Sequence, residues 1–210
     1  MKIGIVGLGL IGGSLAKTFK KNTGHHIAGV DSNPDVEQAA LAAKAVDSVG
    51  GIETCDVVYV CLYPTDTAQY LLDNEFKPGA VLTDVCGVKR FIVEKVSEPL
   101  AKKGLFFCGG HPMAGSEGSG FADSRAGFFT GAHYILMKGD DVDQRAVGTL
   151  TRLAQELGFA SITRATPEEH DRVIAYTSQL AHTISAAFVR NPLAASKGFS
   201  AGSFEDMTRV

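Results

Sequence analysis

The feature that most constrains the fold is a glycine pattern near the start of the chain. The apolar run 2–6 is followed directly by Gly7-Leu8-Gly9-Leu10-Ile11-Gly12, which opens a helix-like stretch at 10–21. In such a strand–turn–helix unit the first glycine permits the tight turn, the second lets a ligand approach the backbone, and the third allows close helix packing. Because the helix N-terminus then faces an anionic group, the pattern predicts a phosphate-binding turn in an α/β fold.

Short apolar runs alternate with helix-like stretches through the first three-quarters of the chain. We expect helices at 10–21, 34–43, 65–72, 89–100 and 142–157, and strands at 2–6, 26–30, 57–62, 81–85, 105–108, 133–137 and 160–163. Alternation of this kind is typical of βαβ units. The sequence therefore predicts an α/β fold with a doubly wound, mostly parallel Rossmann-type sheet.

The second expected strand ends at Asp31, about 20 positions beyond the last glycine of the pattern. A carboxylate there can accept hydrogen bonds from the ribose hydroxyls of a dinucleotide and would repel a 2′-phosphate. We therefore predict that NAD is bound, with NADP less favoured and a flavin as the rarer alternative. The predicted cofactor-binding residues are Gly7, Gly9, Leu10, Ile11, Gly12 and Asp31. A glycine turn without a ligand is the structural alternative.

The pattern changes near residue 166. Thr166 can cap a helix, Pro167 fits its first position, and Glu169 can complete a capping box. No strand signal follows before Asn191, so one helix is expected over 166–190. We predict a dinucleotide-binding domain at 1–165 and the incomplete beginning of an all-helical domain at 166–210.

Charge and composition narrow the class of partner. The net charge is −3, and no basic run could neutralise a series of phosphates, so no nucleic-acid partner is expected. No apolar stretch approaches a membrane span, and no histidine has metal-ligand spacing with cysteines or acids. The four cysteines form no C-x-x-C pair and fit buried reduced thiols. We expect a cytoplasmic protein with no metal and no membrane partner.

A glycine-rich stretch carries the candidate chemistry. Residues 109–131 hold seven glycines together with His111, Ser116 and Glu117, and Pro112 restricts His111 to extended backbone. His111 follows an expected strand at the edge where ligands bind in such sheets. A neutral imidazole there could accept a proton from a substrate hydroxyl. A histidine that only ties down the loop is the alternative.

Two further places could bind a substrate. On the expected helix, Ser178 and His182 are four residues apart and share a face with apolar neighbours. This histidine is either a ligand of the substrate or a hydrogen-bonded core residue. Arg209 offers a planar clamp for a carboxylate, although a terminal arginine is usually solvated.

Together these segments resemble the prephenate and arogenate dehydrogenase family, the NAD-dependent enzymes of the tyrosine branch. The resemblance covers essentially the whole chain in order, including the helix with Ser178 and His182 and the segment 204–209. It rests on the motifs GLGLIGGSLA at 7–16, TDVCGVK at 83–89 and GHPMAGSE at 110–117. The histidine loop and the segment 204–209 are more specific than the glycine pattern. The resemblance implies oxidative decarboxylation of prephenate to 4-hydroxyphenylpyruvate, or of arogenate to tyrosine, by a homodimer.

The resemblance also implies residue roles. His111 would take the ring-hydroxyl proton as hydride passes to NAD, and Arg209 would hold a substrate carboxylate. Ser178 and His182 would belong to the substrate site of the helical domain. Glu117 would lie at the entrance of that site, with Ser116 beside it.

The chain departs from the family pattern at three places. Gly87 stands where the family often has a serine beside the catalytic histidine, so a hydroxyl that could orient His111 is missing. Glu205 stands where relatives often carry a basic residue. The sequence ends at Val210, whereas further helices form most of the family's dimer interface. We therefore expect a truncated chain that binds NAD but turns over poorly, and a homodimer where those helices are present.

Two rival functions remain open from the sequence. A β-hydroxyacid-dehydrogenase-like oxidoreductase would rely on a lysine of the long helix, but residues 166–190 contain none. A non-catalytic NAD-binding module is favoured by Gly87, which stands where the family often has a serine. The sequence does not separate prephenate from arogenate.

Overall fold

The computed structural model describes residues 1–139, 142–195 and 202–208. The chain divides into a first unit, Met1–Pro167, and a second unit, Glu168–Val210.

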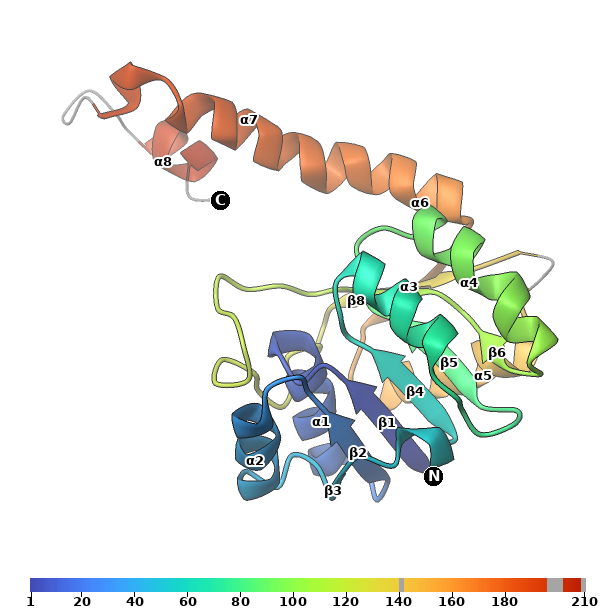
Figure 1. Cartoon of the computed structure of the whole chain (residues 1–210). Helices are drawn as coiled ribbons and strands as arrows, with labels where there is room; N and C mark the ends of the chain where they lie inside the picture. Colours follow the sequence, from blue (N-terminus) through green and yellow to red (C-terminus); the bar gives the residue numbers. More distant parts are fainter. Residues whose placement is uncertain (140–141, 196–201, 209–210) are drawn as a thin grey trace. The chain divides into compact units, whose positions relative to one another are not determined.

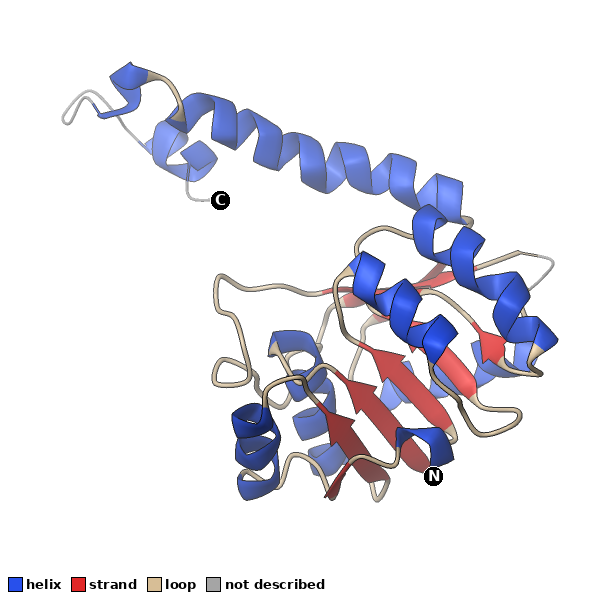
Figure 2. Ribbon diagram, viewed as in Figure 1, coloured by secondary structure: helices blue, strands red, loops and turns tan. Residues whose placement is uncertain are grey.

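A six-stranded parallel sheet forms the centre of the first unit (Figures 1 and 2). Its order is β3-β2-β1-β4-β5-β6, in which Ile5 of β1 lies between Gly29 of β2 and Tyr59 of β4. This order is that of the dinucleotide-binding doubly wound fold, so the predicted fold class is confirmed. The strands are β1 (Lys2–Val6), β2 (His26–Val30), β3 (Ser48–Val49), β4 (Val57–Val60), β5 (Val81–Asp84) and β6 (Phe106–Phe107).

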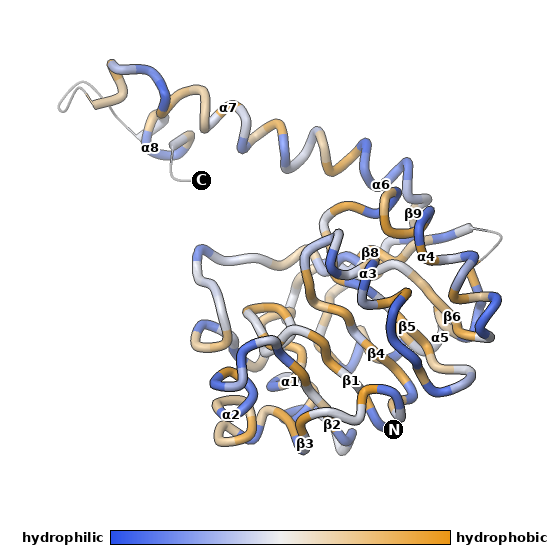
Figure 3. The backbone as a smooth tube through the Cα atoms, viewed as in Figure 1, coloured by the Kyte–Doolittle hydropathy of each residue, from blue (hydrophilic) through white to orange (hydrophobic). Residues whose placement is uncertain are grey.

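Helices cover both faces of this sheet. Buried side chains of α1 (Leu10–Asn22), α2 (Pro34–Ala42) and α5 (Gln144–Glu156) belong to one core cluster. Those of α3 (Pro64–Asp73) and α4 (Arg90–Lys102) belong to the other. Hydrophobic residues predominate along β1 and β4 (Figure 3), and nearly every residue of β1, β4 and β5 is buried, as expected for parallel strands that are covered on both faces.

A second, three-stranded sheet differs from the expectation of a single sheet. It consists of β7 (Gly110–Met113), β8 (His133–Met137) and β9 (Ser161–Ala165), with β7 antiparallel and β9 parallel to β8. The strands expected at 133–137 and 160–163 are therefore present, but they do not extend the main sheet. Tyr134 and Leu136 point their buried side chains into the same core cluster as α1 and α5. That burial explains why these strands form a layer of their own.

Part of the predicted glycine loop is a strand. Residues 110–113 were expected to be loop, but His111 pairs with Ile135 and Pro112 with Tyr134 in the β7–β8 ladder. Pro112 occupies the edge strand of the small sheet, where the missing N–H is tolerated. A strand of four residues that includes a glycine and a proline has little local signal, and its partner strand determines it.

The second unit is helical. It contains α6 (Pro167–Ile174), a π-helical segment at Ala175–Gln179, α7 (Leu180–Val189), a 3₁₀ turn at Pro192–Ala195 and α8 (Gly202–Thr208). One uniform helix was expected over 166–190, whereas the observed helix is interrupted by a wider turn at 175–179. No helix in the described part of the chain is both long and apolar enough to cross a membrane.

Candidate dinucleotide and catalytic site

A cavity of about 600 Å³ opens at the glycine pattern of the first unit. Its volume lies within the range of sites for small molecules and cofactors. All six predicted cofactor-binding residues line it, together with side chains that follow β4 and β5 and with residues 118–120 of the glycine-rich loop. The predicted residues are Gly7, Gly9, Leu10, Ile11, Gly12 and Asp31.

The three glycines of the pattern have different steric reasons to lack a side chain. Gly7 has a φ of +84°, which disfavours other residues. A Cβ on Gly12 would lie 1.9 Å from the carbonyl oxygen of Gly7, so helix and strand could not approach so closely. A Cβ on Gly9 would meet no protein atom within 4 Å and would project into open space. The backbone at Gly9 is thus open to a ligand at the uncapped N-terminus of α1.

Asp31 connects the end of β2 to the glycine turn. Its carboxylate accepts hydrogen bonds from the backbone N–H of Leu8 at 2.8 Å and of Asn33 at 3.0 Å. Each oxygen keeps a lone pair, so the carboxylate can still accept from a ligand hydroxyl. Asp66 adds a second carboxylate to the cavity wall, and no lysine or arginine of the described chain is among its lining residues. This wall suits hydroxyls better than an additional phosphate.

His111 lies in β7 and is half-buried. The residue that precedes it, Gly110, is held on both backbone groups by a buried ion pair. Lys89 donates to the carbonyl oxygen of Gly110 at 2.6 Å, and Asp84 accepts from the N–H of Gly110 at 3.2 Å. The Lys89 ammonium also donates to the carboxylate of Asp84, and both side chains are fully buried. The ion pair therefore fixes the backbone from which the imidazole projects.

The same ion pair joins the end of β5 to the start of α4. Asp84 is the last residue of β5 and also accepts from the N–H of Cys86 at 3.0 Å. Lys89 directly precedes α4. Removing two charges from water is costly, and such pairs persist where their hydrogen bonds are all made. Sequence reasoning used this segment only as a family motif. The missed signal is an acid at the end of a buried strand, followed five positions later by a lysine, with the mostly apolar residues 85–88 between them.

Gly87 lies beside the imidazole of His111. A Cβ at position 87 would be 3.7 Å from Nε2 and 3.8 Å from Cε1 of His111. A side chain here would therefore contact the ring. Val85, two residues earlier, lines the cavity. The segment 85–87 thus connects the cavity with His111, which is not itself among the lining residues.

Ser116 and Glu117 are exposed on the segment between β7 and β8. They directly precede residues 118–120 of the cavity wall. Their place in a substrate site stays a prediction.

The other predicted substrate residues belong to the second unit. Ser178 lies in the π-helical segment and is half-buried, whereas His182 of α7 is exposed. The expected buried face around them is mostly open to solvent, because Ile184 is 38% and Phe188 45% exposed. Arg209 lies outside the described residues. The meeting of Ser178, His182 and Arg209 with His111 stays a prediction.

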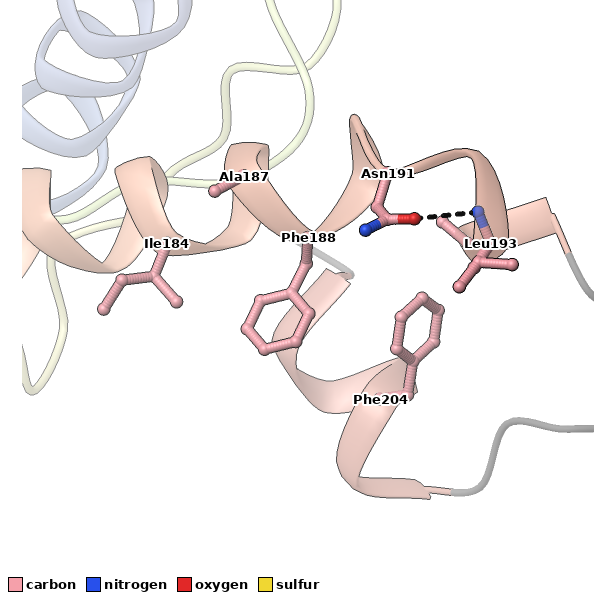
Figure 4. Close-up of a pocket in the computed structure, with 7 residues that line it drawn as sticks. Ile184, Ala187, Phe188, Asn191, Leu193 and Phe204 are labelled. Carbon is pink, nitrogen blue, oxygen red and sulfur yellow. Dashed lines mark hydrogen bonds between the residues drawn. The ribbon is translucent and has the colours of Figure 1, made fainter.

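An apolar groove accompanies this face of the second unit. Phe188 of α7 and Phe204 of α8 approach edge to face with ring centroids 6.3 Å apart (Figure 4). With Ile184 and Leu193 they line a cavity of about 430 Å³. Leu193 donates its N–H to the side-chain oxygen of Asn191 at 2.9 Å, which fixes the turn after α7.

The thiols of the first unit are free and mostly buried. Burial raises the pKa of Cys55, Cys86 and Cys108 to about 11 in each case, and raises that of Cys61 further. Cys61 is the one that lines the cavity. Among the described residues, no group of three histidines, cysteines or acids could hold a metal ion.

Comparison with known proteins gives a consistent family. The prephenate dehydrogenase nucleotide-binding domain model matches residues 15–163, and the prephenate dehydrogenase dimerization domain model matches residues 166–210. Prephenate dehydrogenase of Bacillus subtilis (strain 168) is 34% identical over 224 residues, which cover 98% of this chain and 59% of that protein. The chain thus spans about six-tenths of the length of the curated relatives it matches.

Two solved structures of dehydrogenases are similar to this chain over its whole length. Arogenate dehydrogenase of Synechocystis is 30% identical with a TM-score of 0.86, covering 100% of this chain and 78% of that one. Prephenate dehydrogenase of A. aeolicus, in complex with hydroxyphenyl propionate and NAD+, is 27% identical with a TM-score of 0.89. That match covers 100% of this chain and 77% of the A. aeolicus chain.

Proposed function

The chain belongs to the prephenate dehydrogenase family, and from this premise we propose that it acts in the NAD-dependent oxidative decarboxylation of prephenate or arogenate. The observation that carries the proposal is a histidine held by a buried ion pair, next to the segment that lines a dinucleotide-sized cavity. A dinucleotide fold alone would leave the reaction open. The held histidine adds a group that can move a proton.

The residues of the cavity fit NAD. The backbone at Gly9 has room for a diphosphate, the first turn of α1 offers N–H groups without a side-chain cap, and Asp31 can accept from ribose hydroxyls. The A. aeolicus relative was solved with NAD+. When bound, NAD supplies the acceptor for the hydride. The two carboxylates of the cavity wall, Asp31 and Asp66, disfavour the additional phosphate of NADP.

His111 is the proposed general base. Its neutral imidazole accepts the proton of the substrate ring hydroxyl, as that carbon becomes a carbonyl and then part of an aromatic ring after carbon dioxide leaves. The ion pair of Asp84 and Lys89 fixes the backbone at Gly110, and therefore the position of the ring. Gly87 leaves space beside Nε2, where relatives often place a hydroxyl.

The remaining predicted residues complete the proposed substrate site. Arg209 would bind a carboxylate of the substrate, and Ser178 and His182 would contribute polar groups from the helical unit. Ser116 and Glu117 would lie at the entrance. The apolar groove around Phe188 and Phe204 supports a role of the helical unit in homodimer formation, in line with the matched dimerization domain.

The test follows NADH formation with prephenate or arogenate. We expect His111→Asn to lose about 10²–10⁴-fold in turnover while its dissociation constant for NAD, from calorimetry, stays unchanged. His133→Asn is the matched control, since His133 lies exposed in the same small sheet and should keep wild-type turnover. Equal turnover of wild type and His111→Asn would contradict the role of His111. NAD binding without turnover by the wild type would leave the non-catalytic module or a truncated enzyme.

A further inference from the structure

The segment between β7 and β8 forms part of the cofactor cavity. Gly118, Ser119 and Gly120 line it together with the glycine pattern at the start of α1. Small residues in this place let the backbone approach a ligand closely, and Gly120 adopts a φ of +74°. We propose that residues 118–120 are a second wall of the dinucleotide site, and that Lys17 and Asp123 are the positioning residues that hold this wall. The proposal rests on the proposed function, because it concerns affinity for the same cofactor.

Lys17 ties the segment to the cofactor helix. Its ammonium donates to the carbonyl oxygens of Ser124 at 2.8 Å and Phe121 at 3.4 Å. It also lies 4.1 Å from the centroid of the Phe121 ring, within the range of a cation–π interaction. Lys17 therefore holds the backbone immediately after the wall from two sides.

Three further residues of α1 contact the same segment. The buried hydroxyls of Ser14 and Thr18 accept hydrogen bonds at 3.1 Å from the backbone N–H groups of Arg125 and Gly127, respectively. A Cβ on Gly13 would lie 2.6 Å from Oγ of Ser124, so the segment packs directly on the helix backbone. One face of α1 thus anchors residues 121–127, while its N-terminus forms the glycine turn of the cavity.

Asp123 transmits this anchoring to the wall. Its carboxylate accepts from the N–H of Ser119 at 2.7 Å. A Cβ on Gly118 would lie 2.6 Å from the same carboxylate oxygen, so Asp123 and the wall fit against one another without space for a side chain. Both walls of the cavity are therefore attached to α1, one through the glycine turn at its N-terminus and the other through Ser14, Lys17 and Thr18.

The wall directly follows Ser116 and Glu117, the residues expected at the substrate entrance. A displaced wall would also displace this entrance. Lys17 and Asp123 therefore affect affinity for the cofactor first, and the approach of the substrate second.

Calorimetric titration with NAD tests the proposal on the full chain. Lys17→Met keeps the aliphatic stem and removes the ammonium, and Asp123→Ala removes the acceptor for Ser119. For each variant we expect the dissociation constant for NAD to rise about tenfold, in line with the loss of a charge-assisted hydrogen bond. Lys21→Met is the control, because Lys21 lies exposed one turn further along the same helix and should leave the constant unchanged.

Hydrogen exchange supplies a second measurement. We expect amides of residues 118–127 to exchange faster in Lys17→Met than in wild type or Lys21→Met, with the main sheet still protected. Asp123 is exposed, so its substitution keeps the test valid even if Lys17→Met folds poorly. Wild-type affinity for NAD in both variants would contradict the proposed role of residues 118–120 and would not affect the proposed function. A wild-type chain that binds no NAD would overturn both.

Discussion

The two units differ in how far they bury their apolar side chains. In the first unit, large side chains such as Phe19, Leu82 and Tyr134 are at most 1% exposed. In the second unit, Leu180 is 43% and Leu193 76% exposed. The first unit therefore obtains its stability from its own core, whereas the helices of the second present an apolar face that the described chain leaves open.

The proposed site follows the same division. All predicted cofactor residues, the ion pair of Asp84 and Lys89, and His111 belong to the self-packed first unit. The predicted substrate residues Ser178 and His182 lie on the helices with the open face. Groups that must be held in a fixed position lie in the unit with the packed core, and groups that would complete the substrate site lie where another surface is expected to bind.

Separating the two units should give the largest difference between them in stability. We expect residues 1–167 alone to unfold cooperatively on heating and to bind NAD with the affinity of the whole chain, because core and cavity lie within them. We expect residues 168–210 alone to show little helix by circular dichroism, since short isolated helices are marginal in water. A non-cooperative first fragment, or a fully helical monomeric second one, would contradict the contrast.

A matched pair of leucine substitutions should sharpen the contrast. Leu82→Ala removes a fully buried side chain from β5, so we expect the free energy of unfolding to fall by about 2–5 kcal/mol. Leu180→Ala changes a half-exposed side chain of α7, and we expect a change within about 0.5 kcal/mol. Urea denaturation measures both. Equal effects at the two positions would mean that the apolar face of α7 is covered in solution.

The first unit is also expected to lose stability at alkaline pH. Cys55, Cys86 and Cys108 have pKa values raised to about 11 by burial, and an unfolded thiol titrates near 8.5. Between these values the unfolded chain has released a proton that the folded chain keeps. The free energy of unfolding therefore falls as the pH rises through this interval.

Denaturation of wild type and Cys108→Ala between pH 9 and pH 11 isolates one thiol. We expect a shallower loss in the variant, because Cys108 no longer contributes. The second unit contains no cysteine. Identical slopes would show that Cys108 ionises as easily in the folded chain as in the unfolded one.

Local patterns were enough to predict most of the first unit. Each correctly predicted feature depends on residues that are adjacent in the sequence. These features are the glycine turn at Gly7, the acid at Asp31 and the apolar strands. The strand that contains His111 was missed, because its conformation depends on pairing with β8 rather than on its own residues. The π-helical segment was missed as well, since nothing in Ala175–Gln179 departs from an ordinary helical sequence.

The candidate site was predictable only in part, because several of its contacts join residues that are far apart in the sequence. Gly87 was noted as a departure from a family pattern, and the structure places it beside the His111 ring. Gly110 is hydrogen-bonded by Asp84 and Lys89, which lie 26 and 21 positions earlier in the sequence. These hydrogen bonds cannot be derived from sequence spacing alone. The anchoring of residues 121–127 by α1 spans a far greater distance in sequence.

That anchoring has a consequence for the order of folding. The hydrogen bonds from α1 to residues 121–127 join positions 104 to 111 residues apart. Contacts of such separation require closure of a long loop, which makes them slow to form relative to the adjacent strand–turn–helix unit. A refolding chain would thus acquire its glycine turn early and the opposite side of the cavity late. Dinucleotide affinity would then report the completion of folding, rather than the formation of the helix that starts the site.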